Sequence, residues 1–276
     1  VLQRLIAMLG VHRKRGLLEL APIVGKVAQS KTVAVFAKTA DMKSRGEKVN
    51  GALCVGQPDF TPPPEALRAT TDAVDKGLTA YTAVSGTIEL RRAICKYLKE
   101  IKGMDYGTDQ LLVSCGGKQA IYEVMIAVCG AGDEVVVPAP YWTSYPDIVA
   151  LAGATPVILP TTAAAGYVPT AADIASVLSA RTRMIILCNP SNPSGAVISP
   201  PQLEELAGVL RRPEFRHILV LSDEIYCEIT YDVPHVSFGS LPGMLERTLT
   251  INGFSKSHSM TGALRPLTLS PRIPLD

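Results

Sequence analysis

The sequence has little of several features that would each indicate a particular class of protein. The formal net charge is only +2 over 276 residues, and no long basic run interrupts the body of the chain, so nucleic-acid binding has no support. No apolar run is long enough to span a membrane. The 4 histidines and 6 cysteines form neither CxxC pairs nor a zinc spacing, so no metal is expected. We interpret the cysteines as reduced thiols of the core.

The composition is that of a globular protein, with 47% apolar and 19% charged residues. Residues 1–19 contain no acidic residue before Glu19 and include the basic run 12–15. This segment is interpreted either as the remnant of a transit peptide or as an arm that packs on a partner subunit. We therefore expect a soluble intracellular protein with no membrane association, plastidic under the first interpretation and cytoplasmic under the second.

From residue 109 onward, short apolar runs alternate with amphipathic segments, which predicts an α/β fold with a mostly parallel sheet and helices on both faces. The predicted strands are 110–115, 134–138, 156–159, 183–188, 217–222 and 248–251. The predicted helices are 20–49, 65–76, 87–99, 118–129, 145–151, 171–178 and 201–210. Ligands of such sheets bind at the carboxyl ends of the strands, so the segments that follow the strands are the candidate site.

Lys256 follows the last predicted strand. The apolar, β-branched run that ends at Ile251 predicts a buried strand, and Gly253 ends it before a short polar turn. Burial at such a place would lower the pKa of the lysine and make its neutral amine a nucleophile toward a carbonyl. Taken alone, a lysine after a strand is more often a solvated loop residue.

Two glycines, Gly116 and Gly117, precede Lys118 after the first predicted strand. They and the helix that follows would let backbone N–H groups converge on an anion such as a phosphate. The segment has neither the P-loop pattern nor GxGxxG, so a phosphate here would belong to a cofactor other than a nucleotide. The alternative is a plain tight turn.

Three other strand ends carry candidate side chains. Trp142, the only tryptophan, is placed to stack on a flat ligand, although it could equally anchor its loop to the core. Asn192 lies between two prolines in a rigid loop, where an X-Pro bond could be cis, and its amide could donate to an oxygen or a carboxylate. Asp223 ends a buried strand and could pair with a cationic ring nitrogen, with Tyr226 reaching the same ligand. A magnesium site of an NTPase is disfavoured because the P-loop is absent.

In order and spacing, these residues resemble the class I pyridoxal-phosphate (PLP) aminotransferases of fold type I. The resemblance runs from about residue 20 to Gly262 and is nearest to the bacterial-type and plastid aspartate/prephenate aminotransferases. The motifs that carry it are Gly56-Gln57-Pro58-Asp59-Phe60, Tyr81, Gly116-Gly117-Lys118, Pro140-Tyr141-Trp142, Asn192-Pro193-Ser194-Gly195, Ser222-Asp223-Glu224-Ile225-Tyr226 and Ser255-Lys256-Ser257.

The resemblance implies a transaminase that moves an amino group between aspartate or glutamate and a 2-oxo acid, with prephenate as one candidate. Lys256 would form the Schiff base with PLP and move the proton at the substrate Cα, as the catalytic residue. Cofactor binding would fall to Gly116, Gly117, Lys118, Trp142, Asn192, Asp223, Tyr226 and Tyr81. Substrate binding would fall to Thr32, Gly56, Lys118 and Asn192. Tyr81 would reach the site of a neighbouring subunit, which implies a homodimer with shared active sites.

The resemblance also implies a division of the chain and a departure from the family. Residues 20–55 would be the N-terminal part of a small domain and residues 56–262 the PLP-binding large domain. Residues 263–276 do not follow the family, because Arg265 comes one position late for the arginine that clamps the cofactor phosphate. The prolines at 266, 271 and 274 predict that no internal strand forms there. We therefore expect the C-terminal small domain to be missing.

Three alternatives remain open from the sequence. The departure after Gly262 is what a frame shift, a retained intron or a misjoined exon would produce, so the chain could be a catalytically inactive fragment of the PLP fold. A sensory domain of a transcription regulator would need a helix-turn-helix that the N-terminal segment does not provide. A lyase or decarboxylase on the same fold is not excluded, although Thr32 and Lys118 favour a dicarboxylic substrate.

Overall fold

The structure is a computed structural model that describes residues 31–49, 53–262 and 266–269. The predicted segment 1–19 and Arg265 lie outside these residues. Contacts divide the chain into two units, Val1–Gly56 and Gln57–Asp276, which are described separately. Within the described ranges, no helix is long and apolar enough to cross a membrane.

The first unit contains helix α2 (Lys31–Ser44), which is shorter than the helix predicted over residues 20–49. Phe36, an apolar residue of this helix, is 53% exposed. The second unit begins with α3 (Pro64–Asp75), whose first residue is a proline, as suits a position with no intrahelical N–H partner. Helix α4 (Ile88–Lys102) begins after Thr87, whose hydroxyl accepts a hydrogen bond from the Leu90 N–H at 3.3 Å.

The second unit is built on a seven-stranded sheet in the order β1-β7-β6-β5-β4-β2-β3, as counted over the described residues. Strands β2 to β6 pair in parallel, and β7 runs antiparallel to both of its neighbours, β1 and β6. The strands are β1 (Leu111–Val113), β2 (Glu134–Ala139), β3 (Thr155–Pro160), β4 (Thr182–Cys188), β5 (Leu219–Asp223), β6 (Thr248–Gly253) and β7 (Pro266–Leu269). The predicted α/β class with a mostly parallel sheet is confirmed.

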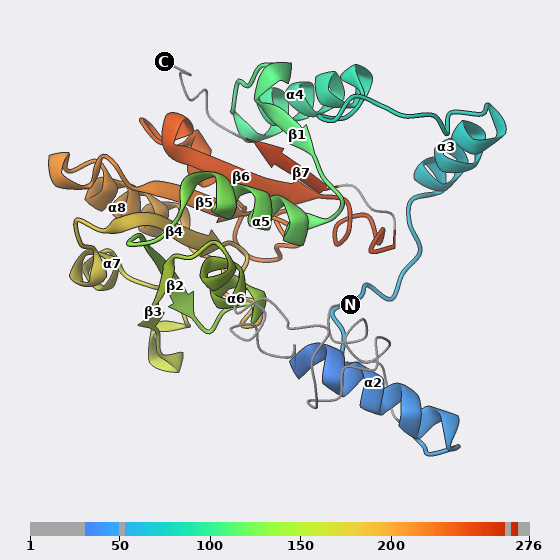
Figure 1. The fold of residues 1–276 in the computed structure, drawn as a ribbon, viewed down its shortest axis with the longest axis horizontal. Coiled ribbons are helices and arrows are strands. Elements are labelled where there is room, and N and C mark those ends of the chain that lie inside the picture. Colours follow the sequence, from blue (N-terminus) through green and yellow to red (C-terminus); the bar gives the residue numbers. More distant parts are fainter. Residues whose placement is uncertain (1–30, 50–52, 263–265, 270–276) are drawn as a thin grey trace, which may run out of the picture. The chain divides into compact units, whose positions relative to one another are not determined.

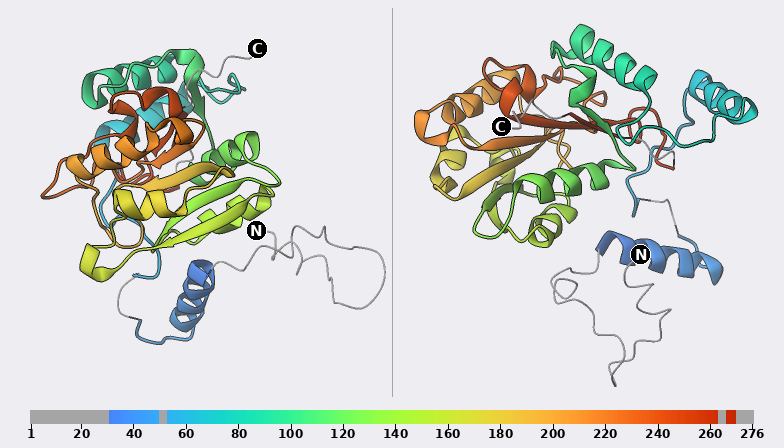
Figure 2. Two further views of the ribbon diagram at one scale, coloured as in Figure 1. Left: turned by 90° about the vertical axis from the view of Figure 1, so that its left-hand side faces the viewer. Right: turned by 45° about the horizontal axis from the view of Figure 1, so that its top comes forward.

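Helices cover both faces of this sheet (Figures 1 and 2). They are α5 (Gly117–Val128), α6 (Ser144–Leu151), α7 (Ala171–Val177) and α8 (Pro200–Leu210). The side chains of Val135 and Val137 pack with α5 and α6, whereas Val136 between them packs with α7 and α8. This alternation has the period of two that a strand imposes, and it places one apolar core on each face. Single-turn 3₁₀ helices occur at Thr108–Gln110, Ala163–Ala165, Pro213–Phe215, Phe238–Ser240 and Leu245–Arg247.

Strand β7 corrects the expectation that the proline-rich residues after Gly262 form no internal strand. Pro266 occupies the first position of β7, opposite Gly253, and Leu267 to Leu269 pair with β6 on one side and β1 on the other. A proline is tolerated at the first residue of a strand, and the three residues that follow keep their N–H groups.

The topology brings the predicted functional segments to one edge. Because β1 and β6 are both antiparallel to β7, they run in the same direction as each other and as β2, β4 and β5. The carboxyl ends of these five strands therefore lie at the same edge of the sheet. Each is followed by one of the segments that the sequence analysis selected, so their convergence is a consequence of strand order.

Candidate active site

Asp223 ends β5 as a buried carboxylate on the face covered by α5 and α6. Its side chain is enclosed with a residue exposure of 5%, and Oδ2 accepts a hydrogen bond of 2.6 Å from the Tyr145 hydroxyl. Oδ1 accepts a hydrogen bond of 3.3 Å from the Ile225 N–H. Burial raises the pKa of Asp223, and the bonds from Tyr145 and Ile225 oppose that rise. A carboxylate so enclosed is suited to a cationic partner.

Tyr145 belongs to this candidate site but was not predicted from the sequence. It lies in α6, is fully buried, and its ring meets the Trp142 ring edge-on with 5.4 Å between centroids. Burial and the adjacent Asp223 carboxylate raise the pKa of the Tyr145 hydroxyl, which therefore stays a proton donor. In the sequence Tyr145 looks like any apolar residue of a core helix, and only its contact with Asp223 distinguishes it.

Trp142 and Lys118 lie together on the same side of the site. The Lys118 ammonium sits over the Trp142 ring, with 4.8 Å from Nζ to the ring centroid. Burial lowers the pKa of Lys118, which Asp147 partly counteracts. Lys118 is nevertheless an exposed residue, and a cation held on an aromatic face keeps its charge available to an anionic ligand.

The first turn of α5 presents backbone N–H groups at the same edge. Gly116 precedes the helix with a φ of +102°, which an L side chain rarely adopts, and no side chain caps this helix start. A Cβ built on Gly117 would lie 3.8 Å from the Ile251 side chain of β6, so the helix start packs over the strand that leads to Lys256. The predicted anion-binding role of this turn is compatible with that geometry.

Asn192 and Tyr226 meet at the neighbouring strand ends. The Asn192 amide donates to the Tyr226 hydroxyl over 3.4 Å. The peptide bonds before Pro190 and Pro193 are both cis, whereas the sequence analysis suggested one. A cavity of about 400 Å³ opens between the loop that carries Asn192 and residues 229–233, which is a volume that suits a small molecule.

Lys256 follows β6, which runs parallel to β5. Ile251 of β6 pairs with Asp223 of β5. The lysine is half-buried, and burial lowers its pKa. A larger fraction of its amine is therefore neutral at a given pH than for a solvated lysine. The desolvation expected from its place after a buried strand is present.

The remaining predicted site residues are placed less completely. Thr32 lies in α2 and Gly56 in a loop, both in the first unit, and so they are not placed against the strand ends of the second. Tyr81 lies in a loop of the second unit, and its side chain is fully exposed. Its own unit does not enclose it.

Known proteins resemble this chain in sequence and in fold. The family described as aminotransferase class I and II matches residues 51–264, well over half of the chain. The chain belongs to this family. A relative in Petunia hybrida, named bifunctional aspartate aminotransferase and glutamate/aspartate-prephenate aminotransferase, is 46% identical over 89% of this chain and 51% of its own length. A probable aspartate/prephenate aminotransferase of Rhizobium leguminosarum is 40% identical over 88% of this chain and 60% of its own length.

Solved structures of the family show the same fold. The aspartate aminotransferase of Rhizobium meliloti has a TM-score of 0.86 at 37% identity, covering 92% of this chain and 64% of that one. The aspartate aminotransferase of Thermus thermophilus with maleate has a TM-score of 0.87 at 34% identity, covering 92% and 65%. The chain thus spans about half to two thirds of the length of the family members it matches.

Proposed function

We propose that this chain supplies the cofactor-binding part of a PLP-dependent transaminase acting on an acidic amino acid and a 2-oxo acid. The observation that carries the proposal is Asp223, a buried carboxylate with a hydrogen-bond donor on each oxygen, at the same sheet edge as the desolvated Lys256. The names of the relatives support the choice of aspartate or glutamate, with prephenate as one acceptor to test.

The residues present fit PLP. Asp223 offers a buried anion for a protonated ring nitrogen, and the first turn of α5 offers N–H groups and Lys118 for a phosphate. Trp142 offers a ring face, and the Asn192–Tyr226 pair offers two donors for a phenolic oxygen. When bound, PLP supplies an electron sink for the electron pair left at the substrate Cα.

The chain's own residues would then divide the work. Asp223 would hold the ring nitrogen in its protonated form, and Tyr145 would orient that carboxylate. Lys256 would hold the cofactor through its neutral amine and would move the proton at the substrate Cα. Lys118 and Thr32 are proposed to bind the distal carboxylate of the substrate. Gly56 and Asn192 are proposed to bind other parts of the substrate. Maleate, a dicarboxylate, accompanies the Thermus thermophilus structure, which supports an acidic substrate.

The exposed apolar residues of the second unit support the proposal of a homodimer. Helix α3 is amphipathic yet buries no residue, and Leu78 and Val84 flank Tyr81 with 73% and 94% of their surface exposed. Such a face needs a partner, and a second copy of the chain would receive Tyr81 at its phosphate site. A plastid location, suggested by residues 1–19, stays a prediction of the sequence.

The proposal is tested by mixing the 276-residue chain with PLP and reducing the mixture with borohydride. We expect PLP to become attached to Lys256, as mass spectrometry of a digest would show, and Lys256→Ala to abolish the attachment. Lys96→Ala, which removes an exposed lysine of α4, is the control and should leave it unchanged. A folded wild-type chain that takes up no PLP would support the inactive-fragment alternative instead.

A further inference from the structure

Glu224 follows Asp223 directly but belongs to the opposite face of the sheet. Leu221 and Asp223 face α5 and α6, where Asp223 meets Tyr145, whereas Val220 faces α8. Glu224, directly after the strand, contacts Ser222 of the second face and Ser237, the neighbour of Phe238 in that core. Glu224 is 1% exposed. A carboxyl group so deep in the protein destabilises the fold unless it is paired, and an apolar residue of similar volume is commonly tolerated better. Its presence behind Asp223 therefore calls for a reason other than stability.

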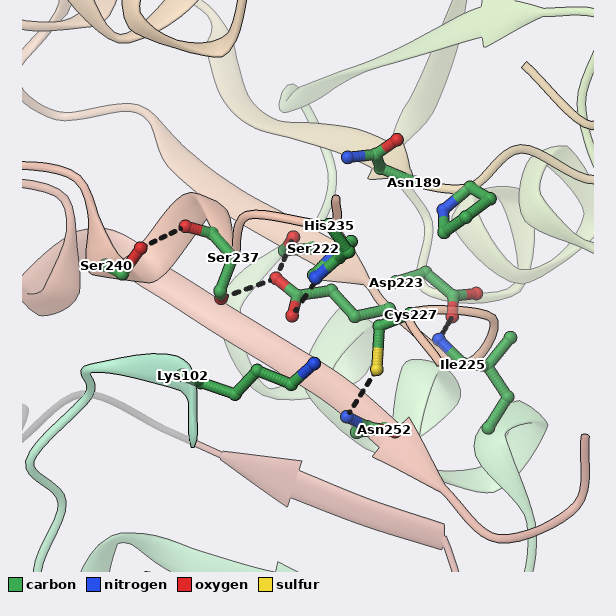
Figure 3. A network of polar contacts seen from close by, with 12 residues as sticks. Lys102, Asn189, Ser222, Asp223, Ile225, Cys227, His235, Ser237, Ser240 and Asn252 are labelled. Atoms are coloured by element: carbon green, nitrogen blue, oxygen red, sulfur yellow. Dashed lines mark hydrogen bonds and ion pairs between the residues drawn. The ribbon is translucent and has the colours of Figure 1, made fainter. Parts of the chain in front are cut away.

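Two hydroxyl groups converge on Glu224. The hydroxyls of Ser222 and Ser237 donate to Oε1 at 2.8 and 2.7 Å. The other oxygen, Oε2, lies 3.8 Å from Nε2 of His235, whose side chain is 2% exposed. Figure 3 shows Ser222, Ser237 and His235 gathered on one side of the turn, with Asp223 and Ile225 on the other.

The backbone around Glu224 links this cluster to the proposed cofactor site. The Glu224 N–H donates to the Ile251 carbonyl of β6 at 2.8 Å, and the Cys227 N–H donates to the Glu224 carbonyl at 2.9 Å. Glu224 thus lies near the start of the turn over residues 223–227, directly after Asp223 and two residues before Tyr226. The contacts that hold Glu224 therefore act one residue from Asp223 and two residues from Tyr226.

We propose that Glu224 is a positioning residue, anchoring the turn over residues 223–227 from the face opposite the site and so fixing Asp223 and Tyr226 toward the cofactor. The inference rests on the proposed function. The orientation of its neighbours is then the reason that a carboxyl group is buried here despite the cost to stability. Two serines from different segments hold one oxygen of Glu224, and the carboxyl group cannot turn without losing both hydrogen bonds.

The test compares three variants of the chain with the wild type by titration with PLP. Glu224→Leu removes the anchor, and we expect its PLP dissociation constant to rise about tenfold or more. Glu224→Gln keeps an oxygen for both serines and should stay near the wild-type value. Phe238→Leu, in the core on the same face and next to Ser237, is the control. It is chosen to lower the melting temperature about as much as Glu224→Leu does, without changing the affinity for PLP.

A second readout needs no cofactor. Hydrogen exchange at the Ile225 and Cys227 amides of the PLP-free chain should be faster in Glu224→Leu than in Phe238→Leu at equal melting temperature. A folded Glu224→Leu that matches the Phe238→Leu control in both readouts overturns the inference. If Glu224→Leu does not fold, the double variant Ser222→Ala/Ser237→Ala replaces it, with faster exchange expected and unchanged exchange overturning the inference. If the wild type binds no PLP, the proposed function fails, and the exchange comparison still decides the role of Glu224 in the turn.

Discussion

Asp223 and Glu224 are adjacent, buried carboxyl groups on opposite faces of one sheet, and their surroundings differ in a way that suits different protonation states. Each oxygen of Asp223 accepts from its own donor, the Tyr145 hydroxyl or the Ile225 N–H. On Glu224 both donors share Oε1, and Oε2 has no hydrogen bond within the described part of the chain. Donors on both oxygens stabilise a carboxylate, whereas one free oxygen leaves room for a proton.

The pKa values follow this difference only in part, because burial raises both. For Glu224, burial raises the pKa to about 7 against the opposing effects of the two serines and Lys102. For Asp223, the pKa is also raised, and a bound cation such as a protonated pyridine nitrogen would reverse that rise. A cationic partner would therefore satisfy the Asp223 carboxylate, whereas a proton can satisfy Oε2 of Glu224.

The largest effect should come from removing the charge of Asp223. We expect Asp223→Asn to weaken PLP binding about 100-fold, or about 3 kcal/mol, because a buried charge partner of the ring nitrogen is lost. Glu224→Gln on the other face should change PLP affinity far less. Titration of both variants under the same conditions checks the comparison. Equal losses from the two substitutions would show that Asp223 has no special relation to the cofactor.

A smaller effect is expected from the donors. Tyr145→Phe leaves Oδ2 of Asp223 without its donor and should weaken PLP binding about tenfold. Leaving a buried polar group without its hydrogen bond costs about 1–3 kcal/mol, and a tenfold loss lies within that range. Ser237→Ala leaves Ser222 on Oε1 of Glu224, so its effect on PLP affinity should be the smaller of the two. Both substitutions remove one hydroxyl, which makes them a matched pair. A larger loss from Ser237→Ala would contradict the assignment of Tyr145 to the site.

Most of the sheet and its helices were predictable because each element has a strong periodicity of its own. Strands such as β4 and β5 are apolar runs of the right length, and helices α3 and α4 begin at Pro64 and Ile88, each one residue from the predicted start. The convergence of Asp223 with the segment of Lys256 also follows from strand order in a parallel sheet. The helices and strands that a local sequence pattern determines could therefore be predicted.

Long-range pairing could not be predicted in the same way. Strand β7 is only four residues long and begins with a proline, and its pairing with β1 and β6 depends on segments far away in the sequence. Tyr145 and Ser237 serve carboxyl groups 78 and 13 residues away, which no local spacing indicates. The roles of Thr32, Gly56 and Tyr81 stay predictions, because they depend on another unit or another subunit.

The smallest and most specific prediction concerns pH, and it isolates the Glu224–His235 pair. Burial raises the pKa of Glu224 from its ordinary value of 4.5 to about 7. Between these two pH values the folded chain keeps a proton that the unfolded chain loses. Glu224 therefore destabilises the fold increasingly as the pH rises from 4.5 toward 7. Burial lowers the pKa of His235 to about 4, with Lys102 acting in the same direction and Glu228 against it. The folded chain therefore loses stability through His235 as pH falls from 6.5 toward 4.

Between these limits the two contributions change in opposite directions and nearly cancel in the wild type. Glu224→Gln should remove only the first, so its free energy of unfolding relative to the wild type should increase from pH 5 to pH 8 by on the order of 2 kcal/mol. His235→Gln should remove only the second, so its relative stability should increase as pH falls from 6.5 to 4. Urea unfolding of the PLP-free variants across this range measures both differences. Parallel pH profiles for both variants and the wild type would show that the pair does not titrate between the folded and unfolded states.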